Sequence, residues 1–164
     1  GNELVMQRRV NLSIQFPYDD SSLLPVHADV WDGDSPYEVV VWLPLVDCHD
    51  TKGMFILPPG PDALHQANLS QFAEGTADDI YDAIEPDLHW PDLPYGEVLI
   101  FSQTLMHGNR INREVETRWS MNCRFKSLFS PSADKLLGEF FEPVTVRAAT
   151  RIGMDYKLPG GFHE

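Results

Sequence analysis

The sequence predicts an all-β barrel or sandwich with minor helices, and three observations support this fold class. The 13 prolines and 11 glycines separate short apolar runs, as they do where strands are joined by turns. Residues 10–16 alternate apolar and polar side chains, and residues 37–46 are dense in β-branched and aromatic residues. At 164 residues the chain is long enough to bury one core. We therefore expect a single domain over residues 1–164.

The first strong strand covers residues 10–16, and its side chains fall into two rows because alternate residues face opposite ways. The apolar row is Val10, Leu12, Ile14 and Phe16, and the polar row is Asn11, Ser13 and Gln15. In an ordinary half-buried strand the polar row faces water. In a barrel that holds a ligand, the polar row instead lines the cavity. The alternation alone leaves both orientations open.

Three further strands are predicted in the first half of the chain. Residues 25–31 follow a polar loop and end at a turn that contains Gly33. Residues 37–46 form the strongest strand, in which Pro44 marks an edge position or a bulge. Residues 54–57 form the third.

Residues 61–94 break the strand pattern. Residues 62–74 and 76–84 have helical spacing, and Thr76 with Asp79 resembles a capping box at the start of the second helix. Such an insert between strands is a candidate lid or substrate wall. A packed insert without contact to substrate stays equally open.

Strands resume after the insert, at residues 97–101 and 116–129. Ser132 can cap a short helix that runs through Phe141. We expect residues 131–164 to form a C-terminal extension that packs on the barrel.

The net charge of −13 argues against nucleic acids and anionic membranes as partners, and a small-molecule substrate is expected instead. The charge is uneven, because several of the 12 basic residues follow His107 closely: Arg110, Arg113, Arg118, Arg124 and Lys126. Such a run is usually a solvated strand face, whereas a pocket for a small carboxylate would use one or two of its members.

The cysteine content favours a reduced, cytoplasmic protein. Cys48 and Cys123 are the two cysteines, and a single disulfide between them stays open. No apolar run reaches the length that a membrane-spanning helix needs.

Two histidines and an aspartate form a candidate metal site. The predicted strand 25–31 presents His27 and Asp29 on the same side, because they are two residues apart. His107, after the strand at 97–101, would complete a facial triad of two histidines and one carboxylate. That triad leaves three metal positions open and is typical of non-haem Fe(II) oxygenases. A His-x-Asp pair is common by chance, and a lone histidine after a strand is usually structural, so the triad needs further support.

Arg118 and Ser120 provide part of that support. Arg118 lies on the strand that follows His107, and Ser120 shares its face. A guanidinium binds a carboxylate through two hydrogen bonds, and a hydroxyl can add another. The pair therefore suits the distal carboxylate of a dicarboxylate co-substrate whose other end chelates the metal.

Four motifs occur in order along the chain: His27-x-Asp29, the strand at residues 96–101, His107-Gly108 and Arg118-x-Ser120. Together with Trp42 and the segment 53–60, they resemble the phytanoyl-CoA dioxygenase superfamily of Fe(II)/2-oxoglutarate-dependent oxygenases. The likeness covers about residues 10–126. It is nearest to bacterial members associated with carbohydrate or aminosugar biosynthesis.

The resemblance implies a double-stranded β-helix, also called a jelly-roll or cupin-like barrel, with a helical insert around residues 61–94. It implies Fe(II) bound by His27, Asp29 and His107, with 2-oxoglutarate and O2 as co-substrates. The residues implied for 2-oxoglutarate are Arg118, Ser120, Asn109 and Trp42, and Asn109 stands where many members carry serine. The residues implied for the substrate pocket are Asn11, Ser13, Gln15 and Trp31. Compared with that family, we expect part of the N-terminal helical region to be missing from this sequence.

The expected activity is hydroxylation or desaturation of a small molecule, with a sugar or aminosugar derivative as the expected substrate. Asp29 favours these reactions, because related halogenases carry a small residue in place of the carboxylate. Two alternatives stay open: a cupin-like, metal-dependent sugar isomerase or epimerase that needs no oxygen, and a non-enzymatic metal-binding module. The sequence does not indicate the oligomeric state.

Overall fold

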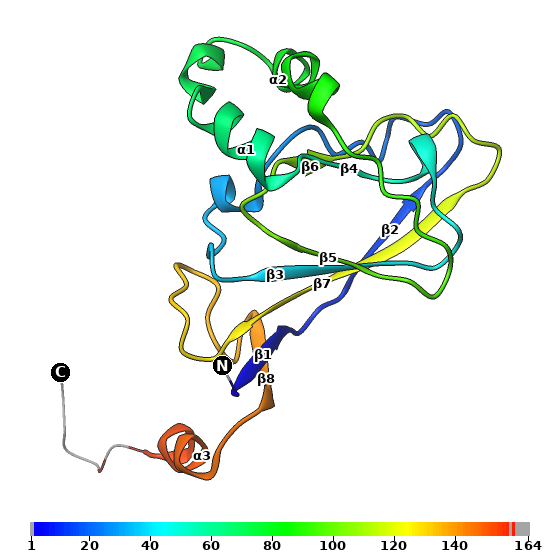
Figure 1. The fold of residues 1–164 in the computed structure, drawn as a ribbon. Helices are drawn as coiled ribbons and strands as arrows, with labels where there is room; N and C mark the ends of the chain where they lie inside the picture. The colour runs from blue at the N-terminus through cyan, green and yellow to red at the C-terminus, as the bar shows by residue number, and fades with distance from the viewer. Residues whose placement is uncertain (1, 158, 160–164) are drawn as a thin grey trace.

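The chain folds into two β-sheets that face each other, and two helices cover the smaller sheet (Figure 1). A computed structural model gives this arrangement and describes residues 2–157 and 159. Over those residues the fold is mostly antiparallel strand, with three α-helices. The predicted strands at 10–16, 37–46, 54–57, 97–101 and 116–129 are present with shorter bounds.

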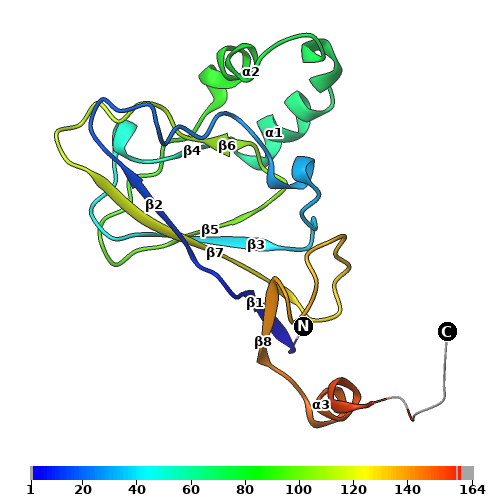
Figure 2. The ribbon, with the colours of Figure 1, turned by 180° about the vertical axis from the view of Figure 1, so that it is seen from behind.

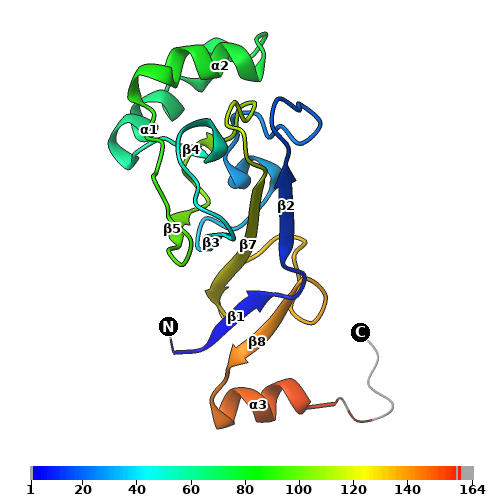
Figure 3. The ribbon, with the colours of Figure 1, turned by 90° about the vertical axis from the view of Figure 1, so that its right-hand side faces the viewer.

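The larger sheet has six strands and is built around the long strand β7 (Arg118–Ser127). The other strands are β1 (Leu4–Gln7), β2 (Asn11–Gln15), β3 (Val39–Pro44), β5 (Leu99–Ser102) and β8 (Phe141–Thr145). Strand β3 pairs with one edge of β7, whereas β2 and β1 share the other edge (Figure 3). Strand β5 extends the sheet beyond β3, and β8 extends it beyond β1.

The smaller sheet pairs β4 (Phe55–Ile56) with β6 (His107–Gly108). It is short, but single bridges extend it on both sides. His27 bridges to His107, and Ile56 bridges to His89. The segment around His27 therefore lies directly beside β6, although 80 residues separate the two histidines in the sequence.

The insert packs into the core, and none of its residues lines the cavity between the two sheets. It contains α1 (Pro59–Gln66), α2 (Ala77–Ile84) and two 3₁₀ turns, at Leu69–Phe72 and Glu85–Asp87. The predicted capping box is confirmed, because Thr76 accepts a hydrogen bond from the Asp79 amide while Asp79 accepts one from the Thr76 amide at 2.6 Å. Tyr81 and Ile84 of α2 join Phe55 of β4 in one buried cluster. The structure favours the packed insert over the substrate wall.

The polar row of β2 faces the interior of the molecule. Gln15 is fully buried, whereas Leu12 and Phe16 of the apolar row are 56% and 55% exposed. The register pairs Ser13 with Ser120 and Gln15 with Arg118, so polar side chains from β2 and β7 share one face. The apolar row lies on the opposite face of the sheet, where Leu12 and Phe16 are exposed to solvent. The cavity-lining orientation of β2 is therefore the one observed.

Residues 25–31 do not form the predicted strand. The segment makes a single bridge at His27, and a 3₁₀ turn at Asp29–Asp32 follows immediately. Gly33 ends that turn with a φ of 87°, a conformation that glycine adopts without strain. Val26 and Ala28 are buried in the core, and this anchors the segment on both sides of His27.

The helix predicted from Ser132 through Phe141 is also absent. Residues 131–140 form turns, because Gly138 takes a φ of 88° and Leu137 bridges to Phe141. The chain then forms β8 and the helix α3 (Ala148–Asp155), which has no buried residue and lies apart from both sheets (Figure 2). Residues 158 and 160–164 of the predicted extension lie outside the described residues. The division into a domain and an extension stays a prediction.

Two simpler expectations are also answered by the structure. Cys48 and Cys123 are both buried free thiols, so the disulfide alternative is not observed. Across residues 2–157 and 159, no helix combines the length and hydropathy needed to cross a membrane.

Candidate metal centre

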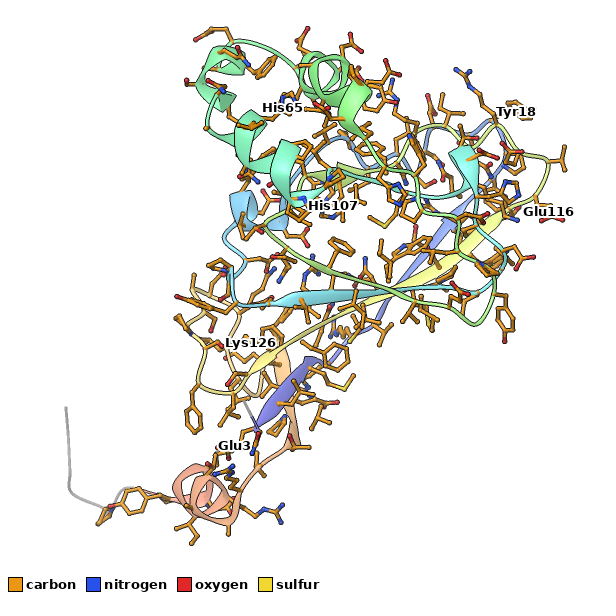
Figure 4. The ribbon with its side chains drawn as sticks, viewed as in Figure 1. Glu3, Tyr18, His65, His107, Glu116 and Lys126 are labelled. Carbon is orange, nitrogen blue, oxygen red and sulfur yellow. The ribbon has the colours of Figure 1, made fainter. Side chains whose placement is uncertain are left out.

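The structure brings His27, Asp29 and His107 together. One ligand atom from each lies within 4.8 Å of the other two. Oδ1 of Asp29 is 3.4 Å from Nε2 of His27 and 4.0 Å from Nε2 of His107. Figure 4 shows His107 between the helices and the larger sheet. His27 comes from the isolated bridge, Asp29 from the 3₁₀ turn and His107 from β6. The sequence predicted that strand alternation would bring His27 and Asp29 together, whereas in the structure the turn at Asp29 does so.

Backbone carbonyls fix the orientation of both imidazole rings. Nδ1 of His27 lies 2.8 Å from the carbonyl oxygen of Pro25, and Nδ1 of His107 lies 2.8 Å from that of Leu105. A carbonyl only accepts hydrogen bonds, so each Nδ1 carries the hydrogen. Each Nε2 then faces Asp29, where it can donate to the carboxylate when the ring is protonated and offer a lone pair to a metal when the ring is neutral. Metal-binding histidines are usually held in this way.

The charge states also suit a cation. Burial alone would raise the pKa of Asp29, but its hydrogen bond with His27 and the charge of Arg124 outweigh burial and lower that pKa to about 2. Burial lowers the pKa of His107 to about 4, and the neighbouring His27 acts in the same direction. At neutral pH the site therefore contains an ionised carboxylate beside a neutral His107. For His27, burial is outweighed by the hydrogen bonds to Asp29 and Pro25, which raise its pKa, so a metal would displace a proton from this ring.

Helix α1 anchors the turn that precedes His107. Oδ1 of Asp62 accepts a hydrogen bond from the Met106 amide at 2.8 Å, and Gln66 donates to the Thr104 carbonyl at 2.6 Å. Sequence reasoning did not assign these two residues a role. Their helical spacing was visible, but their partners lie about 40 residues away along the chain.

Gly108 allows the segment that carries His27 to lie against β6. A Cβ atom at Gly108 would lie 2.7 Å from the carbonyl oxygen of Leu24, 2.7 Å from Cζ of Phe55 and 2.9 Å from the carbonyl oxygen of Pro25. Two of these neighbours are backbone atoms, which cannot move aside without shifting His27.

We expect Gly108→Ala to destabilise the fold by about 1–3 kcal/mol, as overpacking does elsewhere, and to weaken metal binding. Thermal melting of the apoprotein and a Co(II) titration measure the two effects. Gly60→Ala is the matched control, because a Cβ atom there meets nothing within 4 Å. An unchanged melting temperature for Gly108→Ala would contradict the close approach.

A cavity of about 510 Å³ opens beside the three side chains, between the two sheets. Several predicted site residues line it with the triad: Arg118, Asn109, Trp42, Asn11 and Ser13. Ser120, Gln15 and Trp31 are not among the lining residues, and Trp31 is 40% exposed. The structure thus gathers most of the predicted residues around one space and leaves Trp31 at the surface.

Arg118 is the buried cation of this cavity, with only 3% of its surface exposed. It donates to the carbonyl of Gly53 at 2.9 Å and to Oγ of Ser13 at 3.2 Å. Its Nε and Oγ of Ser120 are buried without a hydrogen-bond partner among the described residues. Buried polar atoms are normally satisfied, so these two point to a missing acceptor.

Asn109 holds the loop on the other side of the cavity. Its Oδ1 accepts from the Leu24 amide at 2.6 Å, and its Nδ2 donates to the Ser22 carbonyl at 3.3 Å. Both polar groups of the side chain thus have partners within the protein. Its predicted contact with a co-substrate stays a prediction.

Comparison with known proteins adds a fold likeness. No family model and no curated protein matches the sequence. Among solved structures, the non-haem monooxygenase ThoJ in its nickel complex matches with a TM-score of 0.58 and 21% identity, over 80% of this chain and 48% of that one. HygX from Streptomyces hygroscopicus, with nickel and 2-oxoglutarate bound, matches with a TM-score of 0.55 and 16% identity, over 76% of this chain and 59% of that one. SnoN, a non-haem α-ketoglutarate-dependent epimerase from nogalamycin biosynthesis, matches with a TM-score of 0.55 and 14% identity, over 100% of this chain and 57% of that one.

The chain has the fold of these non-haem enzymes. It spans only about half the length of the solved structures that it matches.

Proposed function

We propose that this chain is the catalytic part of an Fe(II)- and 2-oxoglutarate-dependent oxygenase, built on a double-stranded β-helix. The convergence of His27, Asp29 and His107 at a cavity that also contains the buried Arg118 carries this proposal. The fold likeness supports it, because HygX has been solved with iron and with nickel and 2-oxoglutarate.

The donor set fits ferrous iron. Two imidazoles and one carboxylate on one side of a metal are the ligands of the non-haem oxygenases. One ligand atom from each of these side chains lies within 4.8 Å of the other two, and a facial triad would leave three metal positions for other ligands. His27, Asp29 and His107 would therefore hold the iron, which supplies the oxidising chemistry with O2.

The cavity also fits 2-oxoglutarate. A carboxylate placed near Arg118 would accept a hydrogen bond from its guanidinium, and one from Oγ of Ser120 if that side chain, which lies behind the cavity wall, turned toward it. Trp42 forms part of the wall of the same cavity. Arg118 and Ser120 would hold the distal carboxylate, leaving the keto acid end to reach the metal.

The remaining lining residues describe the space left for a substrate. Val40, Met54 and Phe101 form apolar walls that exclude water from the reacting centre. Asn11, Asn122 and Asp32 supply polar groups that would bind hydroxyl or amino groups. We propose a sugar or aminosugar derivative as substrate, and the structure of HygX with hygromycin B bound supports this class.

Hydroxylation is the first candidate reaction, with desaturation as a variant of it. Epimerisation is the second, because SnoN shares the fold and is an epimerase. The two reactions differ in their products. Hydroxylation adds the mass of one oxygen atom, whereas epimerisation leaves the mass unchanged.

The proposal is tested by incubating Fe(II)-loaded protein with 2-oxoglutarate, O2 and a panel of aminoglycosides and nucleotide sugars. We expect succinate release that depends on all of iron, 2-oxoglutarate and O2, and that rises with one class of sugar. Mass spectrometry of the consumed sugar then separates the two reactions. Binding of iron without succinate release under any condition would favour a non-enzymatic metal-binding module.

A further inference from the structure

The two oxygens of the Asp29 carboxylate have different neighbours. Oδ1 faces the histidines, at 3.4 Å from Nε2 of His27 and 4.0 Å from Nε2 of His107. Oδ2 lies 3.2 Å from Nη2 of Arg124. Arg124 therefore contacts the other oxygen of the carboxylate from the one that lies nearest the histidines.

Arg124 is itself held from behind by buried groups. Its Nε donates to Oε1 of Gln103 at 2.9 Å, and Nε2 of Gln103 donates to the carboxylate of Glu38. Gln103 and Glu38 are both buried, at 0% and 1% exposure. Because a carboxylate accepts hydrogen bonds, Glu38 fixes the Gln103 amide with its oxygen toward Arg124. The three residues come from separate segments, before β3, after β5 and on β7.

A second carboxylate balances the charge of this arginine. Oδ2 of Asp34 lies 3.7 Å from Nη2 of Arg124, and Asp34 also pairs with Lys135. The guanidinium is thus engaged by Asp29, Asp34 and Gln103 at once. This set of partners fixes both its position and its plane, which a single surface ion pair would not do.

We propose that Arg124, braced by Gln103 and Glu38, is a positioning residue that makes Asp29 bind the metal through one oxygen only. The inference rests on the proposed metal site. A carboxylate can bind a metal through one oxygen or both. If Asp29 used both, it would take one of the positions that 2-oxoglutarate and O2 need. Arg124 prevents this by holding Oδ2 away.

Co(II) is the probe, because its visible absorption reports coordination number and it binds without turnover. We expect Arg124→Met to retain Co(II), to change the visible spectrum of the Co(II) protein, and to weaken 2-oxoglutarate binding to it by about tenfold, within the range for outer-shell partners. Arg124→Lys should recover the wild-type spectrum and 2-oxoglutarate affinity only in part, because one ammonium cannot contact both Asp29 and Gln103 as the planar guanidinium does.

Gln103→Leu tests the brace without touching a metal ligand. It removes the acceptor for Nε of Arg124, and we expect the same spectral change in smaller degree. Arg110→Met is the matched control, since Arg110 forms an arginine–aspartate pair with Asp78 at 2.7 Å outside this cavity. It should leave the spectrum and the 2-oxoglutarate affinity unchanged. Melting of each apoprotein verifies that it is folded.

The outcomes separate the inference from the proposed function. If wild-type protein binds no Co(II), the metal site and the inference both fail. If wild-type protein binds Co(II) and 2-oxoglutarate, but folded Arg124→Met and Gln103→Leu match it in spectrum and affinity, the proposed function stands and the positioning role is overturned.

Discussion

His107→Ala is expected to abolish stable metal binding. The substitution removes one of the three proposed metal ligands. His107 is the most buried of the three side chains, so no side chain from the protein surface can take its place. Loss of an outer-shell partner typically costs 10–100-fold in affinity, and we expect the loss of a direct ligand to exceed about 100-fold. Calorimetric titration of the apoprotein with Co(II) measures the effect.

His65→Ala is the matched control for this prediction. His65 is also paired with an aspartate, Asp87, at 3.0 Å, but it lies on α1 outside the cavity. Its replacement should leave metal affinity unchanged. If His107→Ala bound one Co(II) per chain with wild-type affinity, the third ligand would be misassigned.

Arg118→Met is expected to remove 2-oxoglutarate binding while metal stays bound. The guanidinium is buried, and the Ser120 hydroxyl on the same strand has no hydrogen-bond partner within residues 2–157 and 159. Truncating one member of a buried, hydrogen-bonded charge pair costs about 2–5 kcal/mol. That range corresponds to a loss of roughly 30-fold or more in affinity. Titration of the Co(II)-loaded protein with 2-oxoglutarate measures it.

Two further variants make this result interpretable. Arg118→Lys retains the charge and separates loss of charge from loss of the hydrogen-bond fork, and its melting curve reports whether the contact with Gly53 is needed for folding. Arg113→Met is the matched control, because Arg113 belongs to the same basic run but does not line the cavity. Unchanged 2-oxoglutarate affinity in Arg118→Met would contradict the carboxylate assignment.

The sequence predicted three candidate ligands that the structure brings together, but it did not predict the local geometry that does so. His27 and Asp29 were placed on a strand because alternation puts them on one side. The structure brings them together by a bridge and a 3₁₀ turn that ends at Gly33. The same residues converge by a different backbone path, because the burial of Val26 and Ala28 outweighs the strand propensity of the segment.

The orientation of β2 illustrates what alternation leaves undecided. A strand with one apolar and one polar row has two possible orientations, and only its partner distinguishes them. The register with β7 turns Ser13 and Gln15 toward the interior and leaves Leu12 outside. That pairing joins segments about 100 residues apart, so no local pattern contains it.

Arg124 shows how a functional candidate is missed. It belongs to a run of basic residues, and such a run is usually a solvated face. Arg124 nevertheless shares a face of β7 with Arg118, because the two are six residues apart. What marks it out is its contact with Asp29, which depends on the tertiary fold. Strand β1 and helix α3 were missed for a related reason: each is short, and β1 is defined by its pairing with β7 and β8.

The central claim is that His27, Asp29 and His107 hold one ferrous ion beside a 2-oxoglutarate site. Anaerobic titration of the apoprotein with Fe(II) in the presence of 2-oxoglutarate tests it most directly. We predict a visible absorption band that saturates at one iron per chain, requires 2-oxoglutarate and is lost in Asp29→Ala. A protein that binds iron without this band, or forms the band equally well in Asp29→Ala, would contradict the assignment.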